Sequence, residues 1–198
     1  MIQLEAMVEE YLIGVDEAGR GPLAGPVAVG VVAVVPGFDV LAEFPGVKDS
    51  KLLSGQKREV IFTEVERRVL LGDLHFCVQM SGSLYIDLFG ITRAVRKASW
   101  SGIRKLGSAE NSAVLLDGLL RAPNEYMQRT IVGGDLRVPV ISLASILAKV
   151  TRDRLMERMS EHYPEYGFEQ HKGYGTPSHL LAIKRHGLSD IHRLTFCK

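Results

Sequence analysis

Two apolar runs separated by a glycine- and proline-rich turn constrain the fold of this 198-residue chain more than any other feature. The first run covers residues 12–15, and the second, rich in β-branched valine, covers residues 27–35. Runs of this kind bounded by turn residues are typical of buried β-strands, and a short connection favours strands that are neighbours. We therefore predict that the two runs pair side by side in one sheet.

Two adjacent carboxylates, Asp16 and Glu17, follow the first run, and Gly19-Arg20-Gly21 comes soon after them. Neighbouring side chains of a regular strand point to opposite faces, so both acids can serve one site only if the strand breaks there. The glycines can supply that break, and an acid that leaves a buried strand needs a partner to offset its lost hydration. An ordinary acidic loop is the alternative, but we predict a functional site at this junction.

The remaining segments alternate between strand-like runs and helical spacing of apolar residues. Strands are predicted at residues 75–80 and 113–116. Helices are predicted from a cap at Ser54, over residues 91–106 before Gly107, from near Ser142 to residue 150, and from the Thr176-Pro177 cap to Gly187. This order predicts an α/β fold in which helices flank a mixed β-sheet, with a helical C-terminal segment. The length fits a single domain covering residues 1–198.

The composition, 46% apolar and 24% charged, excludes a disordered chain. A formal net charge of +1 means that any binding of nucleic acid must depend on local placement of Lys and Arg. Cys77 and Cys197 are the only cysteines and are far apart, which argues against a disulfide framework or a zinc site. The N-terminal residues lack a signal core and no run is long enough to span a bilayer, so we expect a cytoplasmic protein without membrane contact. A monomer is the default expectation.

Two further acids are candidates for the same site, and the first of them repeats the context of Asp16. Asp117 follows the apolar residues 113–116 and precedes a glycine, and Asp135 follows two glycines. On spacing alone, Asp117 could be a simple turn residue and Asp135 a solvated loop acid. Together with Asp16 and Glu17, however, these two carboxylates would form a hard oxygen-ligand site suited to Mg²⁺ or Mn²⁺. Two such ions about 3.5–4 Å apart can activate a water and stabilise both the attacking and the leaving oxygen in phosphodiester cleavage.

Six segments, in this order and spacing, resemble bacterial ribonuclease HII, the type 2 ribonuclease H. They are Gly14-Val15-Asp16-Glu17-Ala18-Gly19-Arg20-Gly21-Pro22-Leu23, Asp49-Ser50-Lys51, Leu116-Asp117-Gly118, Gly134-Asp135, Ser145-Ile146-Leu147-Ala148-Lys149-Val150-Thr151-Arg152-Asp153 and His171-Lys172-Gly173-Tyr174. The resemblance extends from Leu12 to about Phe196. It implies a ribonuclease H-like fold and endonucleolytic cleavage of RNA in RNA–DNA hybrids, including single ribonucleotides in duplex DNA.

The resemblance also implies 5′-phosphate and 3′-hydroxyl products, and a role in removing misincorporated ribonucleotides and RNA primers. It assigns roles to particular residues of this chain. The family's metal-binding acids, which take Mn²⁺ or Mg²⁺, match Asp16, Glu17, Asp117 and Asp135. The loop that recognises the ribose 2′-hydroxyl, largely through backbone groups, matches Gly19, Arg20 and Gly21. The tyrosine that contacts the sugar on the 3′ side matches Tyr174, and a phosphate-contacting position matches Lys51.

The chain departs from the family pattern at a few positions. Many relatives have a lysine where this chain has Leu52, and a lysine where it has Gly133, so some phosphate contacts would differ. Relatives often have a polar residue in the segment that is Leu119-Leu120 here. The four acids are unaffected by these changes.

Several residues have a second interpretation that does not involve substrate. Arg20 can reach a phosphate or simply pair with a neighbouring acid, and Tyr174 can pack on a sugar or anchor its loop to the core. Solvated loop positions are expected for His171 and Lys172, and an exposed ion pair is expected for Asp153. The basic groups Arg93-Arg96-Lys97 and Arg104-Lys105 form either a solvated helix face or a stripe that binds a duplex.

Two other functions are alternatives to the ribonuclease hypothesis. One is a different metal nuclease on the same fold, such as a Holliday-junction resolvase or a transposase-like domain that acts on DNA. The glycine-arginine-glycine loop argues against it. The 2′-hydroxyl is what distinguishes RNA from DNA, and glycines let backbone groups approach it closely. The other is a non-catalytic module that binds hybrids, and the four intact acids argue against that.

Overall fold

A five-stranded mixed sheet forms the centre of the protein, and the computed structural model describes residues 11–49 and 52–198. The strands lie in the order β3-β2-β1-β4-β5, with β1–β2 and β2–β3 antiparallel and β1–β4 and β4–β5 parallel. Their bounds are β1 Tyr11–Ala18, β2 Val27–Val34, β3 Leu74–Ser81, β4 Ser112–Asp117 and β5 Met127–Ile131. The predicted α/β fold with a mixed sheet is confirmed.

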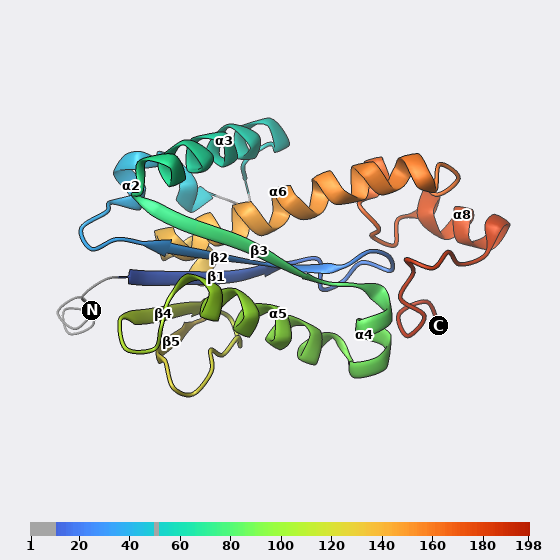
Figure 1. The fold of residues 1–198 in the computed structure, drawn as a ribbon. Helices are drawn as coiled ribbons and strands as arrows, with labels where there is room; N and C mark the ends of the chain where they lie inside the picture. Colours follow the sequence, from blue (N-terminus) through green and yellow to red (C-terminus); the bar gives the residue numbers. More distant parts are fainter. Residues whose placement is uncertain (1–10, 50–51) are drawn as a thin grey trace.

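Helices cover both faces of this sheet, with α3 and α6 on one side and α5 on the other (Figure 1). The helices are α2 Val40–Glu43, η1 Val47–Asp49, α3 Gly55–Leu71, α4 Ser83–Phe89, α5 Ile91–Leu106, η2 Gly134–Leu136, α6 Pro139–His162, α7 Phe168–His171 and α8 Pro177–His186. Within the described part of the chain, no helix combines the length and the apolar character needed to cross a bilayer.

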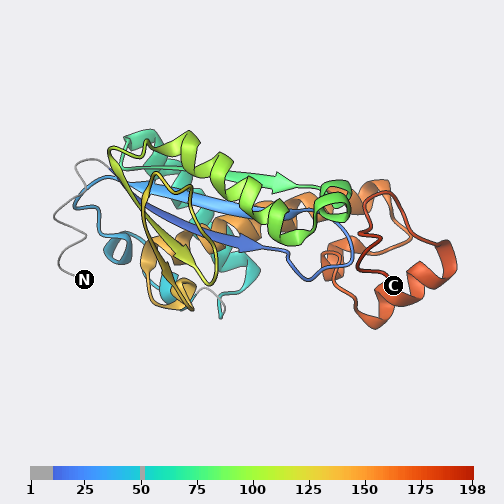
Figure 2. The ribbon, with the colours of Figure 1, turned by 90° about the horizontal axis from the view of Figure 1, so that it is seen from below.

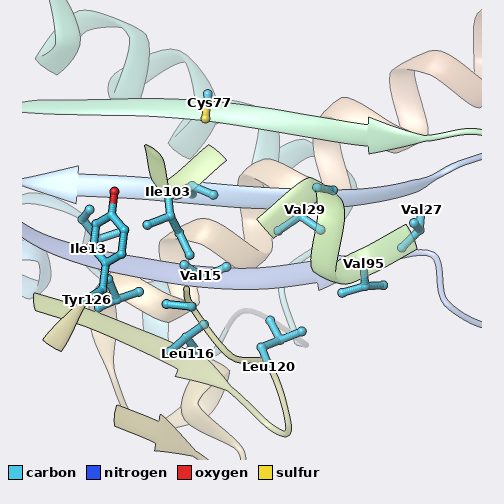
Figure 3. Packing of buried hydrophobic residues seen from close by; sticks show 14 of the residues in the cluster. Ile13, Val15, Val27, Val29, Cys77, Val95, Ile103, Leu116, Leu120 and Tyr126 are labelled. Carbon is cyan, nitrogen blue, oxygen red and sulfur yellow. The ribbon is translucent and has the colours of Figure 1, made fainter. Parts of the chain in front are cut away.

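The two faces of the sheet pack differently against their helices. On the α5 face, branched side chains such as Ile13 and Val15 build one apolar core (Figure 3). On the other face, Gly14 and Gly30 let the backbone of α6 approach directly, because a Cβ at Gly14 would lie 2.4 Å from Val140 O and one at Gly30 would lie 2.1 Å from Ala144 O. The long helix α6 is therefore seated on β1 and β2, the strands that lead toward the predicted site.

Most helix boundaries agree with the sequence signals. Ser54 Oγ accepts a hydrogen bond from Lys57 N at 3.3 Å at the start of α3, and Gly107 ends α5. Thr176 Oγ1 accepts from His179 N at 3.3 Å, so the predicted cap of α8 is confirmed. The predicted start of α6 near Ser142 is wrong, because the helix begins earlier, at Pro139. Proline is favoured at the first position of a helix.

The strand break predicted from the glycines comes only after both acids. β1 continues through Asp16 and Glu17 to Ala18, and it stays paired with β2 up to Ala18 and Ala28. The chain turns only at Gly19, which has a φ of 88°. The two acids therefore lie on a continuous strand rather than in a loop.

The C-terminal part lies beyond the end of the sheet, against the segment that follows β1 (Figures 1 and 2). Leu23 N donates to Gly173 O at 2.8 Å, Gly25 N donates to Ile191 O at 2.8 Å and Arg193 N donates to Leu23 O at 2.7 Å. These backbone bonds bring residues about 150–170 positions apart in the chain into contact. The predicted helical C-terminal segment is thus fixed next to the glycine-rich loop.

Candidate active site

Two of the predicted acids lie at the ends of neighbouring parallel strands, and the backbone of a third is bonded to one of them. The register pairs Val15 of β1 with Leu116 of β4, so the next residues, Asp16 and Asp117, are neighbours. Asp117 Oδ1 accepts hydrogen bonds from Gly134 N at 2.6 Å and from Asp135 N at 3.3 Å. This carboxylate therefore ties the turn that carries Asp135 to the end of β4.

Burial makes the charged state of Asp16 costly. Asp16 is only 5% exposed, and this burial, helped by the nearby Glu17 and Asp117 carboxylates, raises the pKa of Asp16 to about 8. A hydrogen bond with Ser145 of α6 and one from Glu17 N at 2.8 Å oppose the rise. Asp135 is only 4% exposed, so the alternative interpretation of this residue as a solvated loop acid is wrong.

Glu17 lies beside the same cluster but is shared with the loop. Burial raises its pKa, while the Arg20 guanidinium lowers it, with Arg20 Nη1 3.2 Å from Glu17 Oε1. The other carboxylate oxygen, Oε2, is buried and has no hydrogen-bond partner among the described residues. Arg20 had two interpretations, a phosphate contact or a pair with a neighbouring acid. In the structure it pairs with the acid Glu17.

No metal site is already assembled here, because the described residues include no group of three or more His, Cys, Asp or Glu side chains that could hold an ion. The donor set nevertheless fits a hard divalent cation. All four predicted ligands are carboxylates, Asp16 and Asp135 are nearly fully buried, and Glu17 Oε2 is buried without a hydrogen bond. A cation at this place would relieve the mutual repulsion of the acids.

One buried guanidinium donates to the Gly19–Gly21 loop, and a second packs against Gly19 and donates to the segment that follows. Arg193 donates to Gly19 O at 2.7 Å and to Arg20 O at 2.9 Å, and Arg152 Nε donates to Pro26 O at 2.9 Å. A Cβ at Gly19 would lie 2.1 Å from Arg152 Nε, and the φ of 88° also requires glycine. The shape of this loop is therefore set by Arg152 and Arg193, while the side chain of Arg20 points to solvent.

Tyr174 lies against the same loop. A Cβ at Gly21 would be 4.0 Å from Tyr174 Cε1, and the Arg152 guanidinium lies 5.9 Å from the tyrosine ring centroid. The residue is 43% exposed. Gly173, with a φ of 86°, brings the backbone so close to Ala24 O that a Cβ would lie 2.4 Å away. The structure thus brings the predicted tyrosine to the predicted loop and leaves much of it open to solvent.

A cluster of three buried histidines supports the backbone around Tyr174. His179 Nδ1 is 2.9 Å from Tyr174 O, Gly173 N donates to His171 Nδ1 at 3.2 Å, and His179 Nε2 is 3.0 Å from His192 Nε2. Burial lowers the pKa of His179, and burial together with His179 lowers the pKa of His192 to about 4. The sequence expectation of a solvated His171 is wrong, because the ring is buried and stacked on His179 at 4.4 Å between centroids.

Two supporting groups were not found from the sequence. Arg152 belongs to a segment that carries the family resemblance, but its charge suggested no buried role, and no local signal marks Arg193. Both are almost fully buried. A guanidinium can be buried when each donor finds an acceptor, and here the acceptors come from the opposite end of the chain.

The remaining predicted positions are placed as follows. Lys51 lies outside the described residues, so its role stays a prediction. Leu52 and Leu119 are both exposed, and Gly133 turns the chain with a φ of 64° just before the residue that donates to Asp117. Asp153 pairs with Lys149 at 2.7 Å, which confirms the expected ion pair.

Comparison with known proteins agrees with this arrangement. The family model described as Ribonuclease HII matches residues 13–198. The chain is 42% identical over 188 residues to a ribonuclease HII of Ruminiclostridium cellulolyticum, covering 95% of this chain and 70% of that protein. It is also 42% identical over 184 residues to the ribonuclease HII of Endomicrobium trichonymphae, covering 92% of this chain and 83% of that protein.

Solved structures give the same result for the fold. Ribonuclease HII from Archaeoglobus fulgidus, in a structure of a PCNA:RNase HII complex, superposes with a TM-score of 0.76 at 25% identity, covering 93% of this chain and 94% of that one. Ribonuclease H2 from Pyrococcus horikoshii gives 0.72 at 26% identity and covers 93% of each chain. The ribonuclease H-like fold is therefore confirmed. With a family model that matches residues 13–198 and these relatives, the chain belongs to the ribonuclease HII family of nucleases, which are hydrolases.

Proposed function

We propose that this protein is a divalent-metal-dependent endonuclease that cleaves the RNA strand of RNA–DNA hybrids and single ribonucleotides embedded in duplex DNA. The observation that carries the proposal is the placement of acids from β1, β4 and η2, two of them buried, beside a loop whose carbonyls are held by Arg193. Membership of the ribonuclease HII family supports the same reaction class. Hydrolysis would leave 5′-phosphate and 3′-hydroxyl ends.

Asp16, Glu17, Asp117 and Asp135 are proposed to hold Mn²⁺ or Mg²⁺. When bound, such ions supply an activated water and charge stabilisation for the phosphate oxygens. The protein contributes the positions of these side chains. Asp117 is fixed by its bonds from Gly134 N and Asp135 N, and Asp16 by Ser145 and by Glu17 N. Rigid placement of ligands before substrate arrives lowers the cost of reaching the reactive geometry.

The Gly19–Gly21 loop is proposed to select the ribonucleotide. Without side chains on two of its three residues, the loop can bring backbone groups close to a 2′-hydroxyl, which only RNA offers. Arg193 binds the carbonyls of Gly19 and Arg20 from the buried side, so the opposite side of the backbone keeps one shape. Selection of RNA would then depend on backbone geometry rather than on a flexible side chain.

Three further residues are proposed to contact the substrate. The ring of Tyr174, partly exposed beside Gly21, would pack on the sugar on the 3′ side of the cleaved phosphate. Arg20 and Lys51 would contact phosphates, with Arg20 leaving its exposed pair with Glu17 to do so. The biological role proposed from this activity is removal of misincorporated ribonucleotides and RNA primers, by a monomer in the cytoplasm.

The test is incubation with a DNA duplex that contains one ribonucleotide, beside the same duplex made only of DNA, with Mg²⁺, with Mn²⁺ and with a chelator. We expect cleavage on the 5′ side of the ribonucleotide, only with a divalent ion. Two variants compare the site with its surroundings. Ser145→Ala removes a hydrogen bond to Asp16, whereas Asp153→Asn removes an ion pair outside the site. Cleavage of the all-DNA duplex at a similar rate would instead support a DNA nuclease on the same fold.

A further inference from the structure

Helix α5 carries an unusual concentration of positive charge. Its sequence, from Ile91 to Leu106, contains five cations and no acid, whereas the whole chain has a formal net charge of +1. Within the described residues, only Arg104 among these five has a carboxylate within ion-pair distance, Glu125 at 2.9 Å. Like charges three or four positions apart on a helix destabilise it, so this arrangement costs stability that an acidic substitution would recover.

Aromatic rings order these cations into one surface, which we call the α5 surface. It consists of the residues lining a shallow groove on the outside of the helix, Tyr85, Arg93, Arg96, Lys97, Trp100, Ser101 and Arg104. The guanidinium of Arg96 lies 5.5 Å from the Trp100 ring and that of Arg104 lies 5.6 Å from it. Lys97 Nζ lies 4.2 Å from the ring centroid of Tyr85 on α4. Such contacts hold flexible cations in place without neutralising them.

The α5 surface is joined to the strand end that carries Asp117. Trp100 Nε1 donates to Arg121 O at 2.9 Å, and Arg104 pairs with Glu125. Both partners belong to the connection that leaves Asp117 and leads to β5. The surface therefore lies on the opposite side of the sheet from α3 and is fixed to an element of the candidate site (Figures 1 and 2).

We propose that the α5 surface binds the phosphate backbone of duplex DNA that flanks the cleaved ribonucleotide. Arg93, Arg96 and Lys97 are exposed cations without carboxylate partners in the described chain, which is the arrangement that neutralises phosphates by releasing counterions. Such contacts carry no sequence information and position the duplex. The assignment to the flank of a substrate rests on the proposed function, but binding of DNA by this surface can be measured without cleavage.

Trp100 makes the test direct, because it is the only tryptophan of the chain and lies in the middle of the surface. A fluorescently labelled all-DNA duplex of about 30 base pairs is titrated without divalent ions, following both the anisotropy of the label and the Trp100 emission. The variant Arg96→Ala/Lys97→Ala is compared with Lys57→Ala/Arg67→Ala, which removes the same charge from exposed positions of α3 on the other face of the sheet.

We expect the Trp100 emission to change in parallel with the anisotropy. We expect the α5 variant to bind roughly tenfold more weakly at about 0.1 M salt, with the slope of log K against log salt smaller by about 2, while the α3 variant matches the wild type. An unchanged affinity and salt slope in the α5 variant overturn the proposal, and so does Trp100 emission that stays constant at saturating DNA. Because no cleavage is measured, these outcomes stand whether or not the protein cuts at a ribonucleotide.

Discussion

The two halves of the candidate site are built in opposite ways. On the strand side, Asp16 is buried beside the carboxylates of Glu17 and Asp117, and its pKa rises to about 8. On the loop side, the buried guanidiniums of Arg152 and Arg193 donate to backbone carbonyls, and buried histidines hold the tyrosine segment. The strand side is short of positive charge, whereas the loop side has its hydrogen bonds satisfied.

This difference assigns separate tasks to the two halves. A cation would stabilise the ionised form of Asp16, whose burial raises its pKa, so we expect the strand side to need an added metal. A loop whose carbonyls are already bonded keeps its shape without any ligand, so the loop side is preformed. Metal removal should therefore stop chemistry and leave substrate recognition largely intact.

The largest effect is expected from the acids. Asp16→Asn or Asp117→Asn should lower turnover on a single-ribonucleotide duplex by at least about 10³-fold, because the charge that holds the ion is lost. Binding of the same duplex, measured by anisotropy, should stay within about threefold of the wild type, since recognition belongs to the loop side. Near-normal turnover in either variant would remove that acid from the metal site.

Tyr174 tests whether the loop side only recognises or also positions the substrate. Tyr174→Ala should lose roughly 10- to 100-fold in turnover on the single-ribonucleotide duplex, because a displacement of about 1 Å at the reacting phosphate has this effect. Tyr174→Phe keeps the ring and should lose much less. If Tyr174→Ala has normal turnover and only a lower melting temperature, the residue is a loop anchor.

The histidine cluster makes the loop side sensitive to acid. Below about pH 6.5 the unfolded chain takes up protons at His179 and His192, whereas the folded protein keeps His192 neutral down to about pH 4. The contribution of these two histidines to the free energy of unfolding is therefore complete above pH 6.5 and is lost as the pH falls toward 4. For His192 this loss is about 3 kcal/mol at most.

Denaturant unfolding at several pH values measures this loss. His192→Gln should flatten the dependence of the free energy of unfolding on pH between 6.5 and 4. His162→Gln, at an exposed position of α6, is the matched control and should keep the wild-type dependence. Equal pH dependence in both variants would show that the cluster does not titrate in this way.

A smaller effect is expected when the strand side receives its cation. Mn²⁺ at about 100 times its dissociation constant should stabilise the folded protein by about 2.7 kcal/mol, which raises the melting temperature by roughly 5–10 °C. The gain should shrink in Asp135→Asn and persist in Asp153→Asn, whose carboxylate pairs with Lys149 instead. Equal gains in the two variants would count against Asp135 as a ligand.

Local patterns were enough to predict the framework of the fold. The valine-rich runs predicted the β1–β2 pair, and caps such as Ser54 and Thr176 predicted where helices begin. The repeated pattern of an apolar run followed by an acid predicted that Asp16 and Asp117 would meet. β5 was missed because most of Met127–Ile131 is polar or partly exposed, as befits the edge of a sheet.

Features that depend on distant contacts could not be predicted in this way. The burial of Arg193 follows from bonds to Gly19 and Arg20, more than 170 positions away in the chain, and nothing near Arg193 indicates them. The continuation of β1 through Asp16 and Glu17 follows from pairing with β2, and the glycines turn the chain only after both acids. The family resemblance identified Asp135, but its burial required the fold.

The central claim is that Asp16 is protonated without metal and ionises when a cation binds. Isothermal titration of Mn²⁺ into the protein at pH 7, in two buffers with different ionisation enthalpies, measures the protons released. With the pKa of Asp16 at about 8, binding should release close to one proton, and Asp16→Asn should release almost none if it binds at all. Binding of Mn²⁺ without proton release, or with the same release in Asp16→Asn, would contradict the account.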